Sequence, residues 1–162
     1  MRSKKIILVG TSHTIQRGEK RSPVFHEYIE HLVSKKYKIQ VLAEEIDVNS
    51  VVAKIASSAL IDYLIIEPTP EERTALGIQS LNIIEHNIFM EYDDVNSKKA
   101  KDECTKQKEN VYRLREKEWL KRVNSINKFP VLIICGAEHF IPFAELLRQN
   151  DYEVVEECEN WA

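Results

Sequence analysis

The sequence predicts a three-layer α/β fold in which a mainly parallel sheet is flanked by helices. Short apolar segments of strand length alternate with segments whose apolar residues recur at helical spacing, a pattern typical of β-α-β units. The strand-like segments are apolar at consecutive positions, which indicates a sheet that is covered on both faces. The chain of 162 residues can bury one core of ordinary size, so we expect a single domain over residues 1–162.

The first part of the chain predicts the order β-α-β-α-β. Gly10 ends the first apolar segment, as is typical of a sharp exit from a strand. Pro23 follows Ser22 and suits a first helical turn, and Asn49 or Ser50 can cap a second helix. The predicted strands are residues 5–10, 38–43 and 61–66, and the predicted helices are residues 23–37 and a segment that runs from the Asn49 or Ser50 cap to about Ala59.

The end of the chain repeats this alternation, and a charged region separates the two parts. Thr69-Pro70-Glu71-Glu72 resembles a capping box that opens a short helix, which Gly77 could close. From residue 97 the chain is densely charged, and residues 100–126 predict one long helix with an apolar stripe. We therefore expect a charged helical insertion at about residues 69–127. The last predicted elements are a strand at residues 129–135, a helix at 142–149 and a strand at 152–155.

Composition and charge exclude several classes of protein. The 23 Lys and Arg residues nearly balance the 26 Asp and Glu residues, so the charge does not indicate nucleic-acid binding. The apolar runs are shorter than the roughly 20 residues of a transmembrane helix or the roughly 7–15 of a signal-peptide core, so we expect a cytoplasmic protein that does not bind membranes. Cys104, Cys135 and Cys158 lack a CxxC spacing, which argues against a disulfide framework and a zinc ribbon.

The most informative feature is a duplicated motif. Gly10-Thr-Ser-His13 follows the first predicted strand, and Gly136-Ala-Glu-His139 follows the strand at residues 129–135. Ligands of open α/β sheets bind at the carboxyl ends of the strands, so His13 and His139 are expected to share a site. Each could act as a general base or as a metal ligand. The alternative is a structural histidine that caps the next helix or hydrogen-bonds a loop carbonyl.

Acidic residues end two further predicted strands at the same edge. Glu44 and Glu45 follow the second strand, and Glu67 follows the third. One of these acids could activate water or complete a metal site. Because Glu44 and Glu45 are adjacent, their side chains point to opposite sides, and at most one should face the site. The alternative for each acid is a charge at a helix N-terminus or on the surface.

Two arginines on the long charged helix are candidate anion-binding residues. Arg115 lies in the middle of the apolar stripe, and Arg122 lies on the same side. Such an arginine either extends past its apolar neighbours to solvent or is buried against a carboxylate or an anionic ligand. The chain contains no GxGxxG, GxxxxGK[ST] or GxSxG motif, so these routes to nucleotide binding or serine hydrolysis are not indicated.

These residues resemble those of the superfamily that contains the erythromycin esterases, the ChaN-like proteins, the TraB/PrgY proteins and the TIKI proteases. The resemblance rests on the two Gly-x-x-His motifs, the acid at the end of the second strand, and Arg115-Glu116-x-x-Trp119 before the second motif. It covers about residues 5–45 and 113–147. The resemblance implies an α/β core in which the histidines, the acids and the arginine converge on one pocket.

The resulting hypothesis is a hydrolase that activates water for attack on an ester, amide or phosphoester of a small-molecule or peptide substrate. Water would be activated by His13 with a strand-end Glu, or by a divalent ion (Mn, Co or Zn) bound by His13, His139 and Glu44. The expected catalytic residues are His13, His139, Glu44, Glu45 and Arg115, and the expected substrate-binding residues are Gly10, Ser12, Glu67, Gly136, Glu138 and Arg122.

Two alternatives belong to other functional classes. A binding module could keep the pocket for a small ligand or a regulatory partner without turnover. An assembly protein could use only its charged region, with structural histidines. A small domain with a shallow cleft could also form a homodimer in which the second copy supplies a wall of the pocket.

Overall fold

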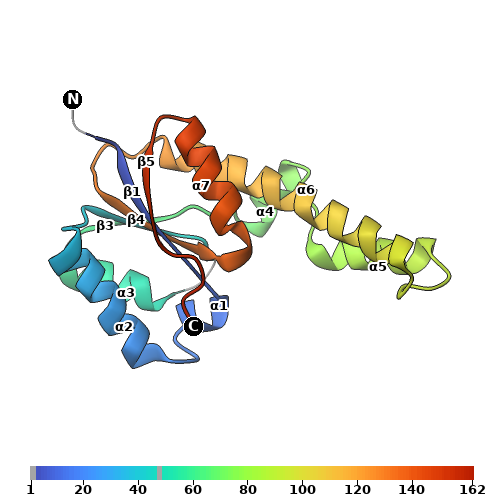
Figure 1. The fold of residues 1–162 in the computed structure, drawn as a ribbon, viewed down its shortest axis with the longest axis horizontal. Coiled ribbons are helices and arrows are strands. Elements are labelled where there is room, and N and C mark those ends of the chain that lie inside the picture. Colours follow the sequence, from blue (N-terminus) through green and yellow to red (C-terminus); the bar gives the residue numbers. More distant parts are fainter. Residues whose placement is uncertain (1–2, 47–48) are drawn as a thin grey trace.

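The computed structural model describes residues 3–46 and 49–162 and contains a five-stranded sheet (Figure 1). The strand order is β3-β2-β4-β1-β5, and every adjacent pair is parallel. Helices cover both faces of the sheet, so the predicted three-layer α/β fold is confirmed. The strands are β1 (Lys5–Thr11), β2 (Val41–Glu44), β3 (Asp62–Ile65), β4 (Val131–Gly136) and β5 (Glu153–Cys158).

The central strands are buried on both faces, as their uninterrupted apolar runs predict. In β1, Ile6 and Leu8 belong to the core on one face, whereas Ile7 and Val9 belong to the core on the other. The residues of β4 alternate between the two cores in the same way. Consecutive aliphatic residues therefore serve two separate cores, and each core needs its own layer of helices.

The first face is covered by helices from the N-terminal part of the chain. Phe25 of α2 and Val52 of α3 are buried in this core. α2 continues into a π-helical turn (Leu32–Lys36), so the single helix that the sequence predicts changes its hydrogen-bonding pattern near its end. Ser50, one of the two predicted caps, accepts a hydrogen bond from a first-turn N–H of α3 at 3.0 Å. The helices on this face are α1 (His13–Gln16), α2 (Ser22–His31) and α3 (Val51–Ala59).

The opposite face is covered by α6 and α7. Trp119 and Val123 of α6 and Phe143 of α7 pack on the strands here. The charged region that the sequence predicts as an insertion therefore also supplies a layer of the fold. The elements of this part are α4 (Pro70–Ala75), α5 (Leu81–Glu91), α6 (Lys98–Val123), a 3-10 turn (Ala137–His139) and α7 (Phe140–Gln149).

The first half of α6 extends beyond the sheet and forms a projecting arm with α5 (Figure 1). The arm has a small core of its own, made by Ile78, Ile84 and Val111. The sequence does not predict α5, because its apolar residues do not form a single stripe. None of the helices in the described part of the chain combines the length and hydropathy that crossing a membrane requires.

Several strand boundaries differ from the prediction for local reasons. β2 begins at Val41 rather than at residue 38, because Lys38 has a φ of 52°, outside the β region. β4 begins after Pro130, which has no N–H to donate to a neighbouring strand. β5 continues to Cys158, beyond its predicted end at residue 155, along β1.

The connections that follow neighbouring strands leave toward opposite faces of the sheet at the carboxyl end of β4. β1 and β2 lead into helices on the first face, whereas β4 leads into α7 on the opposite face. Both neighbours of β4 in the sheet are thus followed by connections that leave in the other direction. Open α/β sheets bind ligands at such a switch point, so we expect a ligand site at this edge of the sheet.

The C-terminal segment folds back over the end of β1. The Trp161 N–H donates to the Gly10 carbonyl oxygen at 2.8 Å, and the Thr11 hydroxyl donates to the Trp161 carbonyl oxygen at 2.7 Å. The Trp161 ring packs against Phe25 of α2. A Cβ on Gly10 would lie 2.0 Å from the carbonyl oxygen of Glu159, so this close approach requires glycine.

We expect Gly10→Ala to lower the free energy of unfolding by about 3 kcal/mol, because the new methyl group overlaps a backbone atom that no side-chain rotation can move. Gly77→Ala is the matched control. Gly77 has a φ of 71° but open space around its Cβ position, so alanine there should cost only about 1 kcal/mol of left-handed strain. Urea unfolding measures both variants. Equal stability of the two would contradict the packing role of Gly10.

Candidate functional site

A cavity of about 210 Å³ lies at the carboxyl edge of the sheet, beside the base of the arm. Its walls come from α1, from the residues that follow β2 and β3, and from α6. The lining combines charged side chains with apolar ones. The lining includes His13, Arg17, Glu45, Glu67, Arg73 and Arg115, together with Ile46, Leu81 and Val111.

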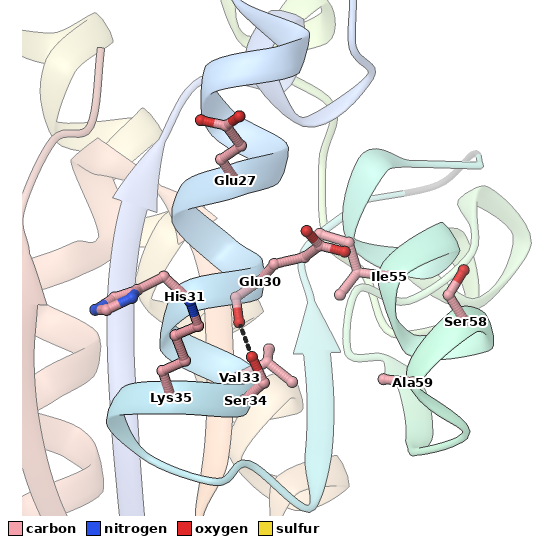
Figure 2. A pocket seen from close by; sticks show the side chains of 9 residues that line it. All are labelled: Glu27, Glu30, His31, Val33, Ser34, Lys35, Ile55, Ser58 and Ala59. Atoms are coloured by element: carbon pink, nitrogen blue, oxygen red, sulfur yellow. Dashed lines mark hydrogen bonds between the residues drawn. The ribbon is translucent and has the colours of Figure 1, made fainter.

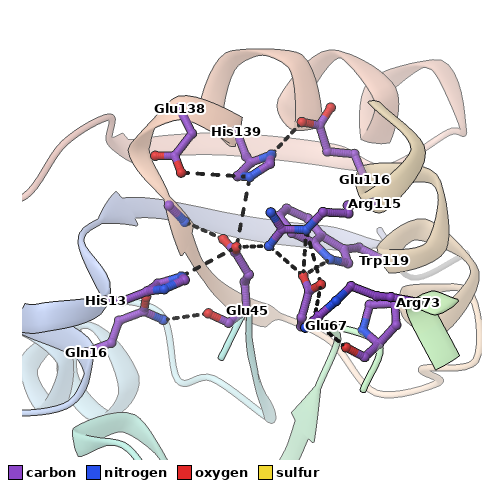
Figure 3. A network of polar contacts seen from close by, with 12 residues as sticks. His13, Gln16, Glu45, Glu67, Arg73, Arg115, Glu116, Trp119, Glu138 and His139 are labelled. Atoms are coloured by element: carbon purple, nitrogen blue, oxygen red, sulfur yellow. Dashed lines mark hydrogen bonds and ion pairs between the residues drawn. The ribbon is translucent and has the colours of Figure 1, made fainter. Parts of the chain in front are cut away.

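Glu45 is at the centre of the polar contacts in Figure 3. It follows β2 directly, and its side chain is only 1% exposed. Its Oε2 accepts a hydrogen bond from Nη2 of Arg115 at 2.6 Å, and its Oε1 accepts one from the Gly136 N–H at 2.7 Å. The glycine of the second Gly-x-x-His motif therefore holds this acid through its backbone.

Arg115 joins the two carboxylates that follow β2 and β3. Besides its bond to Glu45, it donates from Nε to Glu67 Oε1 at 3.1 Å and from Nη2 to Glu67 Oε2 at 2.9 Å. Glu67 also accepts hydrogen bonds from Trp119 Nε1 at 2.8 Å and from Arg73 Nη1 at 3.1 Å. Of the two alternatives for Arg115, the structure shows the one that is buried against carboxylates.

His13 is the exposed histidine of the site. It begins α1, and the side chain of the preceding Ser12 caps this helix. The His13 side chain is 41% exposed, lines the cavity, and places Nε2 3.5 Å from Oε2 of Glu45. The contact with Glu45 raises the pKa of His13 above its ordinary value, and it outweighs burial and the nearby arginine charges, which lower this pKa.

His139 is the buried histidine. Its Nδ1 lies 2.7 Å from Oε2 of Glu116, and its Nε2 lies 3.9 Å from Oε2 of Glu45 (Figure 3). The ring also packs edge-on against Tyr112 and Trp119. The side chain is 0% exposed, and Nε2 has no hydrogen-bond partner among the described residues. Glu116 therefore holds the ring in an orientation in which the unpaired nitrogen faces Glu45.

Two opposing effects set the pKa of Glu45. Burial raises this pKa. Four contacts lower it by more than burial raises it, so the pKa falls below its usual value: the hydrogen bond with His13, the charges of His139 and Arg115, and the Gly136 N–H. Glu45 is therefore an ionised carboxylate at neutral pH. It supplies the negative charge that favours the protonated form of His13.

Glu44 does not join this group, which corrects its expected place among the catalytic and metal-binding residues. Because it is adjacent to Glu45 in an extended segment, its side chain points to the opposite face of the sheet. Its carboxylate accepts hydrogen bonds from the Ser50 hydroxyl, from the Tyr63 hydroxyl at 2.7 Å and from the Gln16 side-chain amide at 2.9 Å. Burial raises the pKa of Glu44, and these hydrogen bonds offset that effect only in part.

Three residues that the sequence predicts to bind substrate contact other parts of the protein instead of lining the cavity. Gly10 allows the C-terminal segment to approach, Ser12 caps α1, and Gly136 donates its N–H to Glu45. None of the three is among the residues that line the cavity. Ser12 thereby holds the start of the helix that carries His13, and Gly136 holds Glu45.

Two further predicted residues, Glu138 and Arg122, also lie outside the cavity lining. Glu138 is more than half exposed, and its Oε1 lies 3.9 Å from Nε2 of His139. Arg122 binds the carboxylate of Glu72 at 2.6 Å and the backbone carbonyl of Glu67 at 3.1 Å. Arg122 therefore ties α6 to α4 and to the end of β3, and only Glu67 of the predicted substrate-binding residues faces the cavity.

Glu116, which belongs to the Arg115-Glu116-x-x-Trp119 motif, and Arg73 are not among the predicted site residues, yet both contact the site. Glu116 binds His139 and also accepts a hydrogen bond from Arg113 at 2.9 Å. A signal was present for Glu116, because Tyr112, Glu116 and Trp119 follow one another at helical spacing on the buried stripe of α6. Arg73 had no comparable signal, since the helix that carries it has no buried stripe.

A larger groove of about 490 Å³ between α2 and α3 does not show the same convergence of polar groups (Figure 2). In this groove the ring of His31 points away from the carboxylate of Glu30, which extends toward Ile55. Within residues 3–46 and 49–162, no group of three or more His, Cys, Asp or Glu side chains is arranged to hold a metal ion. The cavity beside Glu45 is therefore the stronger candidate site.

No family model, curated protein or solved structure matches this chain. The candidate site is accordingly assigned from the contacts, burial and charges of its own residues.

We expect Glu45→Gln to lower the pKa of His13, because the substitution removes the negative charge that raises it. In the intact protein, the raised pKa means that His13 contributes stability at low pH and that this contribution is lost as the pH rises through the folded-state pKa. A histidine NMR titration measures the shift, and His13→Gln assigns the resonance. Glu138→Gln is the control and should leave the His13 pKa unchanged. An unchanged pKa in Glu45→Gln would contradict the assigned cause.

We expect Arg115→Met to lower the free energy of unfolding by about 3–5 kcal/mol, because it leaves two buried carboxylates without their shared cation. Arg148→Met is the matched control, since Arg148 binds Glu156 at 3.0 Å on the surface and an exposed pair contributes less than about 1 kcal/mol. Urea unfolding at neutral pH compares the two variants. If Arg115→Met is as stable as Arg148→Met, the buried pairs do not stabilise the fold as described.

Proposed function

We propose that this protein is a hydrolase that uses His13, Glu45 and Arg115 to activate water at the carboxyl edge of the sheet. The supporting observation is a cavity-lining histidine placed against a buried carboxylate, which is itself held by an arginine and a backbone N–H. A histidine paired with an acid is a common general base for attack by water. We also infer a relationship to the erythromycin esterase, TraB and TIKI superfamily from the two Gly-x-x-His motifs at this edge.

In the proposed reaction, neutral His13 takes a proton from a water molecule in the cavity while the water oxygen attacks a carbonyl carbon or a phosphorus atom. The bond to the leaving group then breaks, and His13 returns the proton to that group. Glu45 stays ionised and stabilises the imidazolium that forms between the two steps. The rate should therefore rise with pH until His13 is fully deprotonated.

We infer that the cavity accepts a substrate with a polar or negatively charged group, because the guanidinium groups of Arg73 and Arg115 line it beside the carboxylates of Glu45 and Glu67. A guanidinium in such a position also stabilises negative charge that develops in the transition state. A cavity of about 210 Å³ suits a small-molecule ester, amide or phosphoester or the end of a peptide.

The unpaired Nε2 of His139 is the one observation that favours a divalent ion (Mn, Co or Zn) in the site. Such an ion would take His139, His13 and Glu45 as its donors, since Glu44 lies on the other face. However, Arg115 already supplies a positive partner to Glu45 at 2.6 Å. We therefore propose the route without a metal, in which His139 supports Glu45 from the buried side.

The test measures hydrolysis of p-nitrophenyl acetate, p-nitrophenyl phosphate and bis(p-nitrophenyl) phosphate. We expect His13→Gln to lower kcat by about 100- to 10,000-fold, the usual contribution of a general base. His26→Gln is the control, because His26 lies on α2 beside Glu30, away from the cavity. Dialysis against a chelator, followed by addition of Mn, Co or Zn, should leave the rate unchanged.

Three outcomes would contradict parts of the proposal. Turnover that survives in His13→Gln would remove His13 as the base. Activity that disappears with the chelator and returns with one metal would favour the metal route. Saturable binding of an anionic probe with no product would identify a binding module, the alternative that shares the same pocket.

A further inference from the structure

The apolar residues of α5 are spread around the helix, between polar ones, and only Ile84 and Ile88 are buried. Ile84 and Ile88 face the arm core or α6 and are buried. On the other sides, Phe89 is 66% exposed, Met90 is 70% exposed and Ile83 is half exposed. Large apolar side chains that a single chain leaves exposed on one helix mark a candidate interaction site.

The arm also carries an apolar groove next to this exposed surface. The groove has a volume of about 480 Å³ and runs between α5 and the first half of α6. Ile88, Phe89 and Val95 line it with Cys104, and Lys101 is among the α6 residues at its margin. The arm therefore has both an apolar ridge on α5 and a groove beside that ridge.

The charges of the two helices are complementary. Residues 81–91 contain two acids, Glu85 and Glu91, and no lysine or arginine. Residues 98–108 contain five lysines and only two acids, so this half of α6 is basic. Within one chain, Lys108 already binds Glu85 at 2.7 Å across the two helices. A second arm would present the same acidic α5 to the same basic α6.

We propose that the arm is a homodimerisation element, in which α5 of a second copy of this chain packs into the groove between α5 and α6. A two-fold arrangement satisfies both arms at once, because each supplies one ridge and one groove. The two arms then form a four-helix bundle that covers Phe89 and Met90 of both copies. A second copy fits better than an unrelated partner because the ridge, the groove and both charges occur together in this one chain.

The experiment measures the mass of the full-length chain by light scattering after size-exclusion chromatography over a wide range of concentrations. We expect twice the mass of one chain for the unmodified protein and the mass of a single chain for the double variant Phe89→Lys with Met90→Lys. Leu60→Lys is the matched control. Leu60 is 91% exposed at the end of α3, away from the arm, so this variant should remain a dimer.

Circular dichroism and hydrogen exchange complete the test. The double variant should keep its helical content, because both residues are exposed in one chain, and amides of α5 should exchange more slowly in the unmodified protein than in the variant. A single-chain mass for the unmodified protein at every concentration would overturn the proposal, even if another protein binds the arm. A dimer that survives in the double variant, or is lost in Leu60→Lys, would place the interface elsewhere and overturn it as well.

Discussion

The pairing of Arg115 with Glu45 and Glu67 is the constraint on which the rest of the site depends. Two carboxylates that follow neighbouring strands are buried close together, which is costly unless a cation lies between them. That cation comes from α6, so the pairing also fixes α6 across the ends of β2 and β3. The same helix brings Glu116 to His139. This one helix thus holds Glu45 and orients His139, while α1 brings His13 to the same acid.

The adjacent acids Glu44 and Glu45 show how the two faces of a sheet create different chemistry. Both are almost fully buried, so burial raises the pKa of each. Glu44 receives only neutral hydrogen-bond donors, and its pKa stays above the usual value. Glu45 faces an arginine and two histidines, and its pKa falls below the usual value. Only the acid on the cavity side is therefore suited to orient His13 and to stabilise its charged form.

The sequence predicts the fold because its central strands are aliphatic at consecutive positions, as in Ile6 to Val9, and such strands need cover on both faces. It also predicts which strand ends carry polar groups. It cannot tell which of Glu44 and Glu45 faces the cavity, because that depends on the register of β2 against β4, where Glu44 lies opposite Ile134. The contact between Glu116 and His139 could not be predicted for a similar reason, because the two residues belong to different elements.

In the arm, the polarity of the two helices does not match their surroundings in a single chain. α6 is strongly polar, yet it carries Val111 and Arg115 one turn apart, so the wall of the cavity and the cation of the site lie on the same rigid element. α5 carries apolar residues on several sides, and a single chain leaves Ile83, Phe89 and Met90 exposed. The groove beside α5 is lined in part by Lys101, Cys104 and Lys108 of α6, the helix that also carries Arg115. One continuous helix therefore connects the groove that a second copy would fill with the candidate site.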